Sequence, residues 1–184
     1  MKKTLWQYIV ELYNDVPLGL YEGLVSVLCI GLVVALVKYS KNRSWRIISG
    51  VCLVEYVFLI YCATVIFRPH WYEQKFNLTP FWSYVAIVNG DGDLLHENAM
   101  NVAVFLPVGL FLGMSFKKIK LLGVALIAFC ISTSIEALQF FFWKGFAELD
   151  DVIHNTLGCI IGYGIFKAIE YGIRSCTRKK EGYI

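Results

Sequence analysis

The amino-acid sequence predicts an all-α fold, a polytopic membrane bundle of about five transmembrane helices. Of its 184 residues, 58% are hydrophobic and only 17% are charged, whereas soluble domains carry about a quarter charged residues. A helix needs roughly 20 mostly apolar residues to cross a bilayer. Five stretches meet that requirement and leave almost nothing for a soluble domain, so we expect one membrane domain over residues 1–184. The stretches are residues 18–37, 47–67, 99–116, 119–143 and 152–173.

Two shorter segments are expected at the membrane surface. Near the N-terminus, Leu5, Ile9 and Leu12 recur at helical spacing with polar residues opposite, which is typical of an interfacial helix. Residues 81–88, between the second and third predicted spans, are apolar but too short to cross the bilayer. Irregular backbone exposed to lipid is costly, so we predict a re-entrant or interfacial segment there.

The distribution of Lys and Arg predicts the orientation. Eleven of these residues lie in three segments that share one side of the predicted topology, namely 38–46, 117–120 and 174–180. The opposite side has only five, and the basic side of a membrane protein is normally cytoplasmic. We therefore expect a multi-pass protein of the cell membrane with its N-terminus outside and its C-terminus in the cytoplasm. The net charge of +3 then reflects anchoring to anionic lipid, and no nucleic-acid partner is expected.

Six cysteines and a few charged groups raise the question of disulfides, metals and cofactors. None of the cysteines falls in a predicted connecting loop, and there is no CxxC pair, so we predict no disulfide framework. His154 beside Asp150 could begin a metal site, but the sequence has no HExxH motif and no His pair. We therefore predict no metal and no cofactor, with His154 and Asp150 as the weak alternative.

Polar residues gather at the predicted outer end of the bundle. Arg68 ends the second span, Asn101 opens the third, Glu136 and Gln139 lie in the last turns of the fourth, and three more residues open the fifth. A charge inside a membrane needs a partner, and Arg68 is the nearest candidate partner of Glu136. That pair could be functional or purely structural. The predicted ligand-binding set is Arg68, Asn101, Glu136, Gln139, Asp150, Asp151 and Asn155, with Phe81 and Trp82 as an aromatic lid.

Two glycine pairs predict where helices touch. Gly109 and Gly113 lie in the third span, and Gly158 and Gly162 lie in the fifth, each at a spacing of four residues. Small residues at this spacing let two transmembrane backbones approach closely. Helix packing within the chain is the simplest role, and the same faces could also support a homo-oligomer.

These residues occur in an ordered set of motifs that resembles the VanZ family of small bacterial membrane proteins linked to teicoplanin resistance. The set runs from Arg68 to Gly162 and comprises Arg68 itself, NLTPF at 77–81, NVAVFLPVG at 101–109, EALQ at 136–139 and DDVIHNTLG at 150–158. One departure stands out, because relatives often carry Gly-Arg just before the acidic pair. Here the corresponding stretch reads Lys144-Gly145-Phe146.

The resemblance implies a bacterial cell membrane and lowered susceptibility to lipoglycopeptide antibiotics, but it implies no reaction. Our leading hypothesis is that the outer polar residues bind a lipid-tailed molecule, either a membrane lipid, a lipid-linked envelope precursor or the antibiotic itself. The alternative is an intramembrane hydrolase or transferase in which Glu136 or Asp151 is the general base and Arg68 holds a charged group. A transporter is less favoured, because the sequence contains no inverted repeat.

Overall fold

The computed structural model describes residues 42–181, with side chains to residue 175. It confirms the all-α membrane fold, because four helices in this part are long and apolar enough to cross a bilayer. They are Arg43–Ile66, Asp93–Ser115, Leu121–Phe141 and Leu149–Ser175, and they match the second to fifth predicted spans. The first predicted span, 18–37, and the predicted N-terminal interfacial helix lie outside the described residues.

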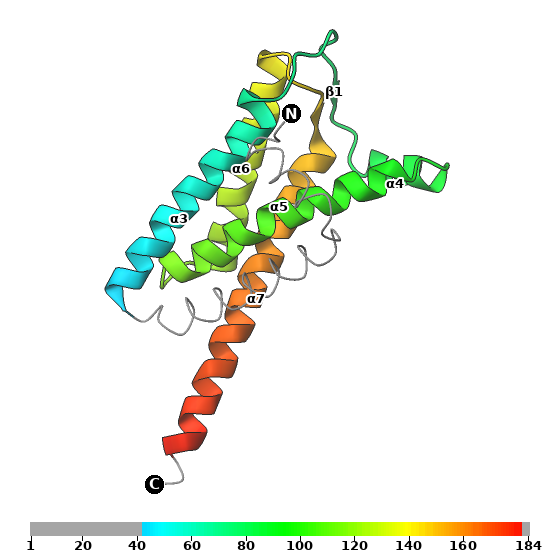
Figure 1. Cartoon of the computed structure of the whole chain (residues 1–184). Helices are drawn as coiled ribbons and strands as arrows, with labels where there is room; N and C mark the ends of the chain where they lie inside the picture. Colours follow the sequence, from blue (N-terminus) through cyan, green and yellow to red (C-terminus); the bar gives the residue numbers. More distant parts are fainter. Residues whose placement is uncertain (1–41, 182–184) are drawn as a thin grey trace, which may run out of the picture. The chain divides into compact units, whose positions relative to one another are not determined.

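The described elements follow one another as five α-helices, a π-helical turn and two very short strands (Figure 1). In chain order they are α3 (Arg43–Tyr61), the π-turn η1 (Cys62–Ile66), β1 (Phe76–Asn77), α4 (Trp82–Val88), α5 (Asp93–Ser115), α6 (Leu121–Phe141), β2 (Ala147–Glu148) and α7 (Leu149–Glu181). The π-turn closes with a 2.9 Å hydrogen bond from the Phe67 N–H to the Cys62 carbonyl. This wider turn ends the second span immediately before Arg68.

Helices α5 and α7 cross in direct backbone contact (Figure 1). A Cβ added to Gly109 would lie 1.9 Å from the Cys159 carbonyl oxygen, and one added to Gly162 would lie 1.9 Å from the Leu106 carbonyl oxygen. At Gly158 the corresponding distance, to the Val102 carbonyl oxygen, is 2.1 Å. No side chain fits in these gaps, which confirms the predicted helix-packing role of the glycines.

Hydroxyl groups fasten α3 to the helices beside it. The Tyr56 hydroxyl donates a 3.0 Å hydrogen bond to the Val104 carbonyl of α5, and its ring packs against Phe111 at a centroid distance of 6.3 Å. The hydroxyls of Tyr61 and Ser134 hydrogen-bond each other, which joins α3 to α6. A hydrogen bond between helices avoids an unsatisfied polar group in an apolar setting, so these tyrosines fix the position of the second span.

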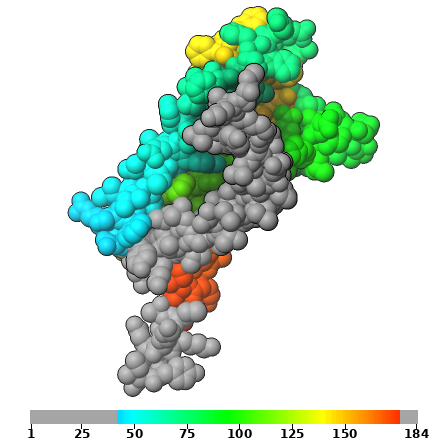
Figure 2. Space-filling model, viewed as in Figure 1, coloured from blue at the N-terminus to red at the C-terminus, as the bar shows by residue number. Residues whose placement is uncertain are grey.

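The connection after α3 is tied to the connection between α6 and α7. Strands β1 and β2 pair in parallel with Phe76 opposite Ala147, and the Trp71 N–H donates a 2.7 Å hydrogen bond to the Trp143 carbonyl. Figure 2 shows the atoms of these two segments, in teal and yellow, gathered at one end. The pairing therefore joins the two connections immediately before α7 begins.

The predicted re-entrant or interfacial segment, residues 81–88, contains the short helix α4. Its seven residues are too few to span a bilayer. Its depth in the membrane stays a prediction.

The glycine contacts predict that Gly158→Ala destabilises the protein. The new methyl group has to push α5 and α7 apart, which should cost about 1–3 kcal/mol and lower the unfolding temperature measured in mild detergent. Gly164→Ala is the matched control, because nothing lies within 4 Å of a Cβ at that position of the same helix. An equal loss for both variants would contradict the proposed backbone contact.

Candidate functional site

The Asp150 carboxylate holds the start of α4 against α7. Its Oδ1 accepts a 2.5 Å hydrogen bond from the Phe81 N–H, and its Oδ2 accepts from the Ser83 N–H at 3.0 Å and the Ser83 hydroxyl at 2.6 Å. The Asn98 side-chain amide donates to the same Ser83 hydroxyl at 3.1 Å. A carboxylate that receives the first N–H groups of a helix acts as its N-terminal cap. Both oxygens of Asp150 are thus engaged within the protein, and its role here is to fix α4.

Asp151 and Asn155 connect α7 to two different helices. The Asp151 Oδ1 accepts a 2.7 Å hydrogen bond from the Asn101 amide of α5. One turn further along α7, the Asn155 amide donates to the Ser132 hydroxyl of α6 at 2.8 Å. Asn155 and Ser132 are both buried. The start of α7 is therefore hydrogen-bonded to α5 through the predicted residues Asn101 and Asp151, and to α6 through Asn155 and Ser132.

Glu136 and Gln139 lie buried at the end of α6. The Glu136 Oε2 accepts a 3.0 Å hydrogen bond from the Glu148 backbone N–H, and the Gln139 amide donates to the Thr64 carbonyl at 3.1 Å. The buried Gln139 Oε1 has no hydrogen-bond partner among the described residues. Contrary to the ion pair suggested by the sequence, Arg68 forms no salt bridge with Glu136, because the α6–α7 connection supplies a backbone donor instead.

The α6–α7 connection contacts both the side chain and the backbone of Arg68. Its guanidinium packs on Gly145, where an added Cβ would lie 3.1 Å from the Arg68 Cζ. The Lys144 ammonium donates a 2.8 Å hydrogen bond to the Arg68 carbonyl. Lys144 belongs to the stretch that differs from the Gly-Arg often found in relatives. In this chain it binds the backbone of Arg68. Within the described part of the chain the half-buried guanidinium has no ion-pair partner.

Glu148 belongs to this site although the sequence-based set did not include it. The Trp82 indole N–H donates to its Oε2 at 3.1 Å. Burial raises the pKa of Glu148, and the nearby charge of Glu97 adds to that rise, whereas the Trp82 hydrogen bond and the Arg68 charge act to lower the pKa. Arg68 also acts electrostatically on Glu136 and Asp151. The site thus places one guanidinium among three carboxyl groups, and the acidic run at residues 148–151 was the sequence signal for the third.

A cavity of about 490 Å³ opens beside Glu148. Both aromatic and polar side chains line this cavity. The lining residues are Gln74, Lys75, Phe76, Asn77, Trp82, Phe146 and Glu148. Trp82 is thus the predicted lid residue that reaches the cavity, while Phe81 is 56% exposed and contacts the Tyr84 ring. Ser83, Tyr84 and Ser132 also contribute to the site's hydrogen bonds without having been predicted, because a single hydroxyl carries no sequence pattern.

His154 is buried and partnered by an aromatic residue. Its Nε2 lies 2.9 Å from the Tyr84 hydroxyl, with which it shares a hydrogen bond. Its Nδ1 has no hydrogen-bond partner among the described residues. In the described residues, no group of three or more His, Cys, Asp or Glu side chains is arranged to hold a metal ion.

Apolar spans closed at one end by a layer of buried amides and carboxyl groups define a multi-pass helical membrane protein with a polar site. The VanZ/LLP1 family model matches residues 53–170, more than half of the chain, and the chain belongs to this family. Protein VanZ of Enterococcus faecium is 32% identical over 97 residues, which cover 53% of this chain and 55% of the relative. The chain therefore spans about half the length of that relative. No solved structure matches the chain.

The raised pKa of Glu148 predicts a specific pH dependence of stability. Above pH 4.5, the ordinary value for this carboxyl, the unfolded chain releases the proton more readily than the folded protein. The Glu148 contribution therefore destabilises the fold progressively as pH rises toward the raised pKa. Glu148→Gln, which can still accept the Trp82 hydrogen bond, should remove this part of the decline in unfolding temperature.

Glu73→Gln is the control for that measurement, because Glu73 is exposed and its pKa is lowered by its hydrogen bond to Lys75. It should leave the decline with pH in place. A Glu148→Gln profile that parallels the unaltered protein from pH 4.5 upward would show that Glu148 titrates as an ordinary surface carboxyl.

Proposed function

We propose that the polar site lies at the extracytoplasmic end of the bundle and binds the polar head of a lipid-tailed or cell-envelope molecule. By doing so, the protein reduces bacterial susceptibility to lipoglycopeptide antibiotics such as teicoplanin. The observation that carries this proposal is the half-buried Arg68 guanidinium, which has no ion-pair partner among the described residues. A guanidinium in that state is available to bind a carboxylate or phosphate of a ligand in bidentate fashion.

The neighbouring carboxyl groups support recognition of hydroxyl and amino groups. Glu136 and Asp151 each use one oxygen for a hydrogen bond within the protein, and no described residue donates a hydrogen bond to the other oxygen of either. Such oxygens accept hydrogen bonds from sugar hydroxyls or from an ammonium group. Together with Arg68, they suit a head group that carries both acidic and donor functions.

The adjoining cavity supports a bulky head group with apolar parts. Its volume of about 490 Å³ falls within the usual range for small-molecule sites. Phe76, Trp82 and Phe146 offer ring faces on which a sugar or an aromatic ring can pack. The Lys75 ammonium lies 5.4 Å from the centre of the Phe146 ring, but its charge is already paired with Glu73.

The family supports the biological side of the proposal. The relative in Enterococcus faecium is named Protein VanZ, and the VanZ resemblance implies teicoplanin resistance. Teicoplanin combines an acyl tail with a sugar-bearing peptide head, so it is itself a candidate ligand alongside membrane lipids and lipid-linked precursors. The excess of basic residues at the opposite end supports an extracytoplasmic position for the site.

Resistance measurements test the proposal directly. Expressed in a susceptible Gram-positive host, the protein should raise the minimum inhibitory concentration of teicoplanin. Arg68→Gln, Glu136→Gln and Asp151→Asn should each return that concentration toward the value of the host alone, because each removes one charged ligand contact. The Glu136 and Asp151 changes also keep the side chain's size. Membrane fractions should contain each variant in unchanged amount.

Glu73→Gln is the matched control, since Glu73 lies in the same connection but is exposed and paired with Lys75. It should retain full resistance. Retention of resistance by the inserted Arg68, Glu136 and Asp151 variants would overturn the proposed site.

An intramembrane hydrolase or transferase is the second candidate, favoured by one observation. The buried Glu136 carboxyl is held by the Glu148 backbone N–H through one oxygen only, so the other could accept a proton from an attacking water or hydroxyl group. Purified protein should then convert a labelled lipid-linked envelope precursor, and Glu136→Gln should stop the conversion. Resistance without any turnover of such a precursor would exclude this candidate and leave the binding function.

A further inference from the structure

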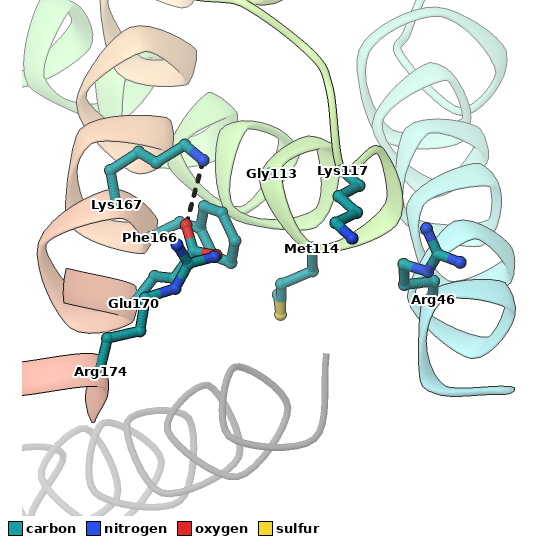
Figure 3. Close-up of a pocket in the computed structure, with 8 residues that line it drawn as sticks. All are labelled: Arg46, Gly113, Met114, Lys117, Phe166, Lys167, Glu170 and Arg174. Atoms are coloured by element: carbon teal, nitrogen blue, oxygen red, sulfur yellow. Dashed lines mark hydrogen bonds and ion pairs between the residues drawn. The ribbon is translucent and has the colours of Figure 1, made fainter. Parts of the chain in front are cut away.

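The end of the bundle opposite Arg68 contains a second cavity with a different chemistry. It measures about 260 Å³ and lies between α3, the end of α5 and the middle of α7. Figure 3 shows Arg46 from α3 and Lys117 from the segment after α5 on one side, with Lys167, Glu170 and Arg174 from α7 on the other. Among the described residues, four basic side chains and one carboxylate line the cavity, which is an excess of three positive charges.

The cations on the α7 side are already partly neutralised. Glu170 accepts a 3.1 Å hydrogen bond from Lys167 and a 2.5 Å hydrogen bond from Arg174. These pairs join residues three and four positions apart on one helix, which is an ordinary geometry for exposed ion pairs. Glu170 is therefore fully used by its own helix.

Arg46 and Lys117, on the other side, have no counterion among the described residues. The Arg46 Nε is buried and lacks a hydrogen-bond partner in the same part of the chain. A buried donor without an acceptor costs free energy, and a bound anion would relieve that cost. The described residues of the cavity thus supply no negatively charged group with several acceptor oxygens for these two cations.

A neighbouring groove indicates which molecule brings that group. It measures about 530 Å³, shares Arg46 and Lys117 with the first cavity, and is otherwise lined mainly by apolar side chains, including Phe116, Ile119 and Ile127. A phospholipid with its phosphate in the first cavity could place one of its hydrocarbon chains in this groove. A free phosphate would leave the groove empty.

We propose that Arg46, Lys117, Lys167 and Arg174 form a binding site for the phosphate of an anionic phospholipid in the adjoining leaflet. The cavity is smaller than a typical small-molecule site, which suits a head group with its tail outside. Basic pockets between transmembrane helices bind anionic lipid head groups in this way. The site is separate from the polar site at Arg68 and does not depend on the function proposed for it.

Titration of the purified full-length protein with lipid tests the site. Phosphatidylglycerol added to the protein in non-ionic detergent should raise the unfolding temperature in a saturable manner, and phosphatidylcholine should not. The Arg46→Gln and Lys117→Gln double variant should need at least about tenfold more phosphatidylglycerol for half of the effect, because two charged hydrogen bonds are lost. Inorganic phosphate is tested in parallel.

Arg43→Gln and Lys120→Gln form the matched control, since both residues are exposed, lie in the same two segments and line neither cavity. This double variant should bind phosphatidylglycerol as the unaltered protein does. An equal loss in both double variants would reduce the effect to surface charge and overturn the site. Stabilisation by inorganic phosphate that equals that by phosphatidylglycerol would overturn the lipid assignment.

Glu170→Gln should strengthen phosphatidylglycerol binding, whereas a variant that merely folds poorly would weaken it. The substitution frees Lys167 and Arg174 for the ligand, so phosphatidylglycerol should bind more tightly than to the unaltered protein. Native mass spectrometry of the unaltered protein should also show one phosphatidylglycerol retained in preference to phosphatidylcholine. Weaker binding by Glu170→Gln, or equal retention of both lipids, would contradict the proposal.

Discussion

The direct contact between the backbones of α5 and α7 is the constraint on which the rest of the structure depends. In a bilayer the hydrophobic effect does not drive helices together, so close packing of small residues has to do so. Gly158 and Gly162 meet the carbonyls of Val102 and Leu106, which fixes how far each helix is shifted along the other. With that shift fixed, Asn101, next to Val102, reaches Asp151 on α7.

The polar end divides into groups that stabilise the fold and groups that remain available. Asp150 accepts three hydrogen bonds from residues at the start of α4, and the Asn155 amide is bound to Ser132. These contacts compensate for placing polar groups among apolar helices. Arg68 has no such partner in the described part of the chain, although three carboxyl groups feel its charge. Under the proposed binding function, this guanidinium is the group that a ligand would engage.

Hydropathy predicted the four described spans, and glycine spacing predicted packing faces on the third and fifth of the five predicted spans. The order of polar residues predicted only that Asn101 and Asp151 lie at the same end of the bundle. The same reasoning paired Arg68 with Glu136, which the structure does not show. The reason lies in strands β1 and β2, whose two residues each are too short for any sequence pattern. Their pairing brings the Glu148 N–H over Glu136 and so supplies a donor that only the folded chain reveals.

If the glycine contact between α5 and α7 assembles the polar site, that contact has to control how strongly Asn101 and Asp151 interact, and a double-mutant cycle measures this interaction. Unfolding of Asn101→Ala, Asp151→Ala and the double variant gives the coupling between these two side chains. We predict a coupling of about 1 kcal/mol or more in the unaltered protein and its loss when the cycle is repeated with Gly158→Ala. An undiminished coupling in the Gly158→Ala background would show that the polar site assembles without the glycine contact.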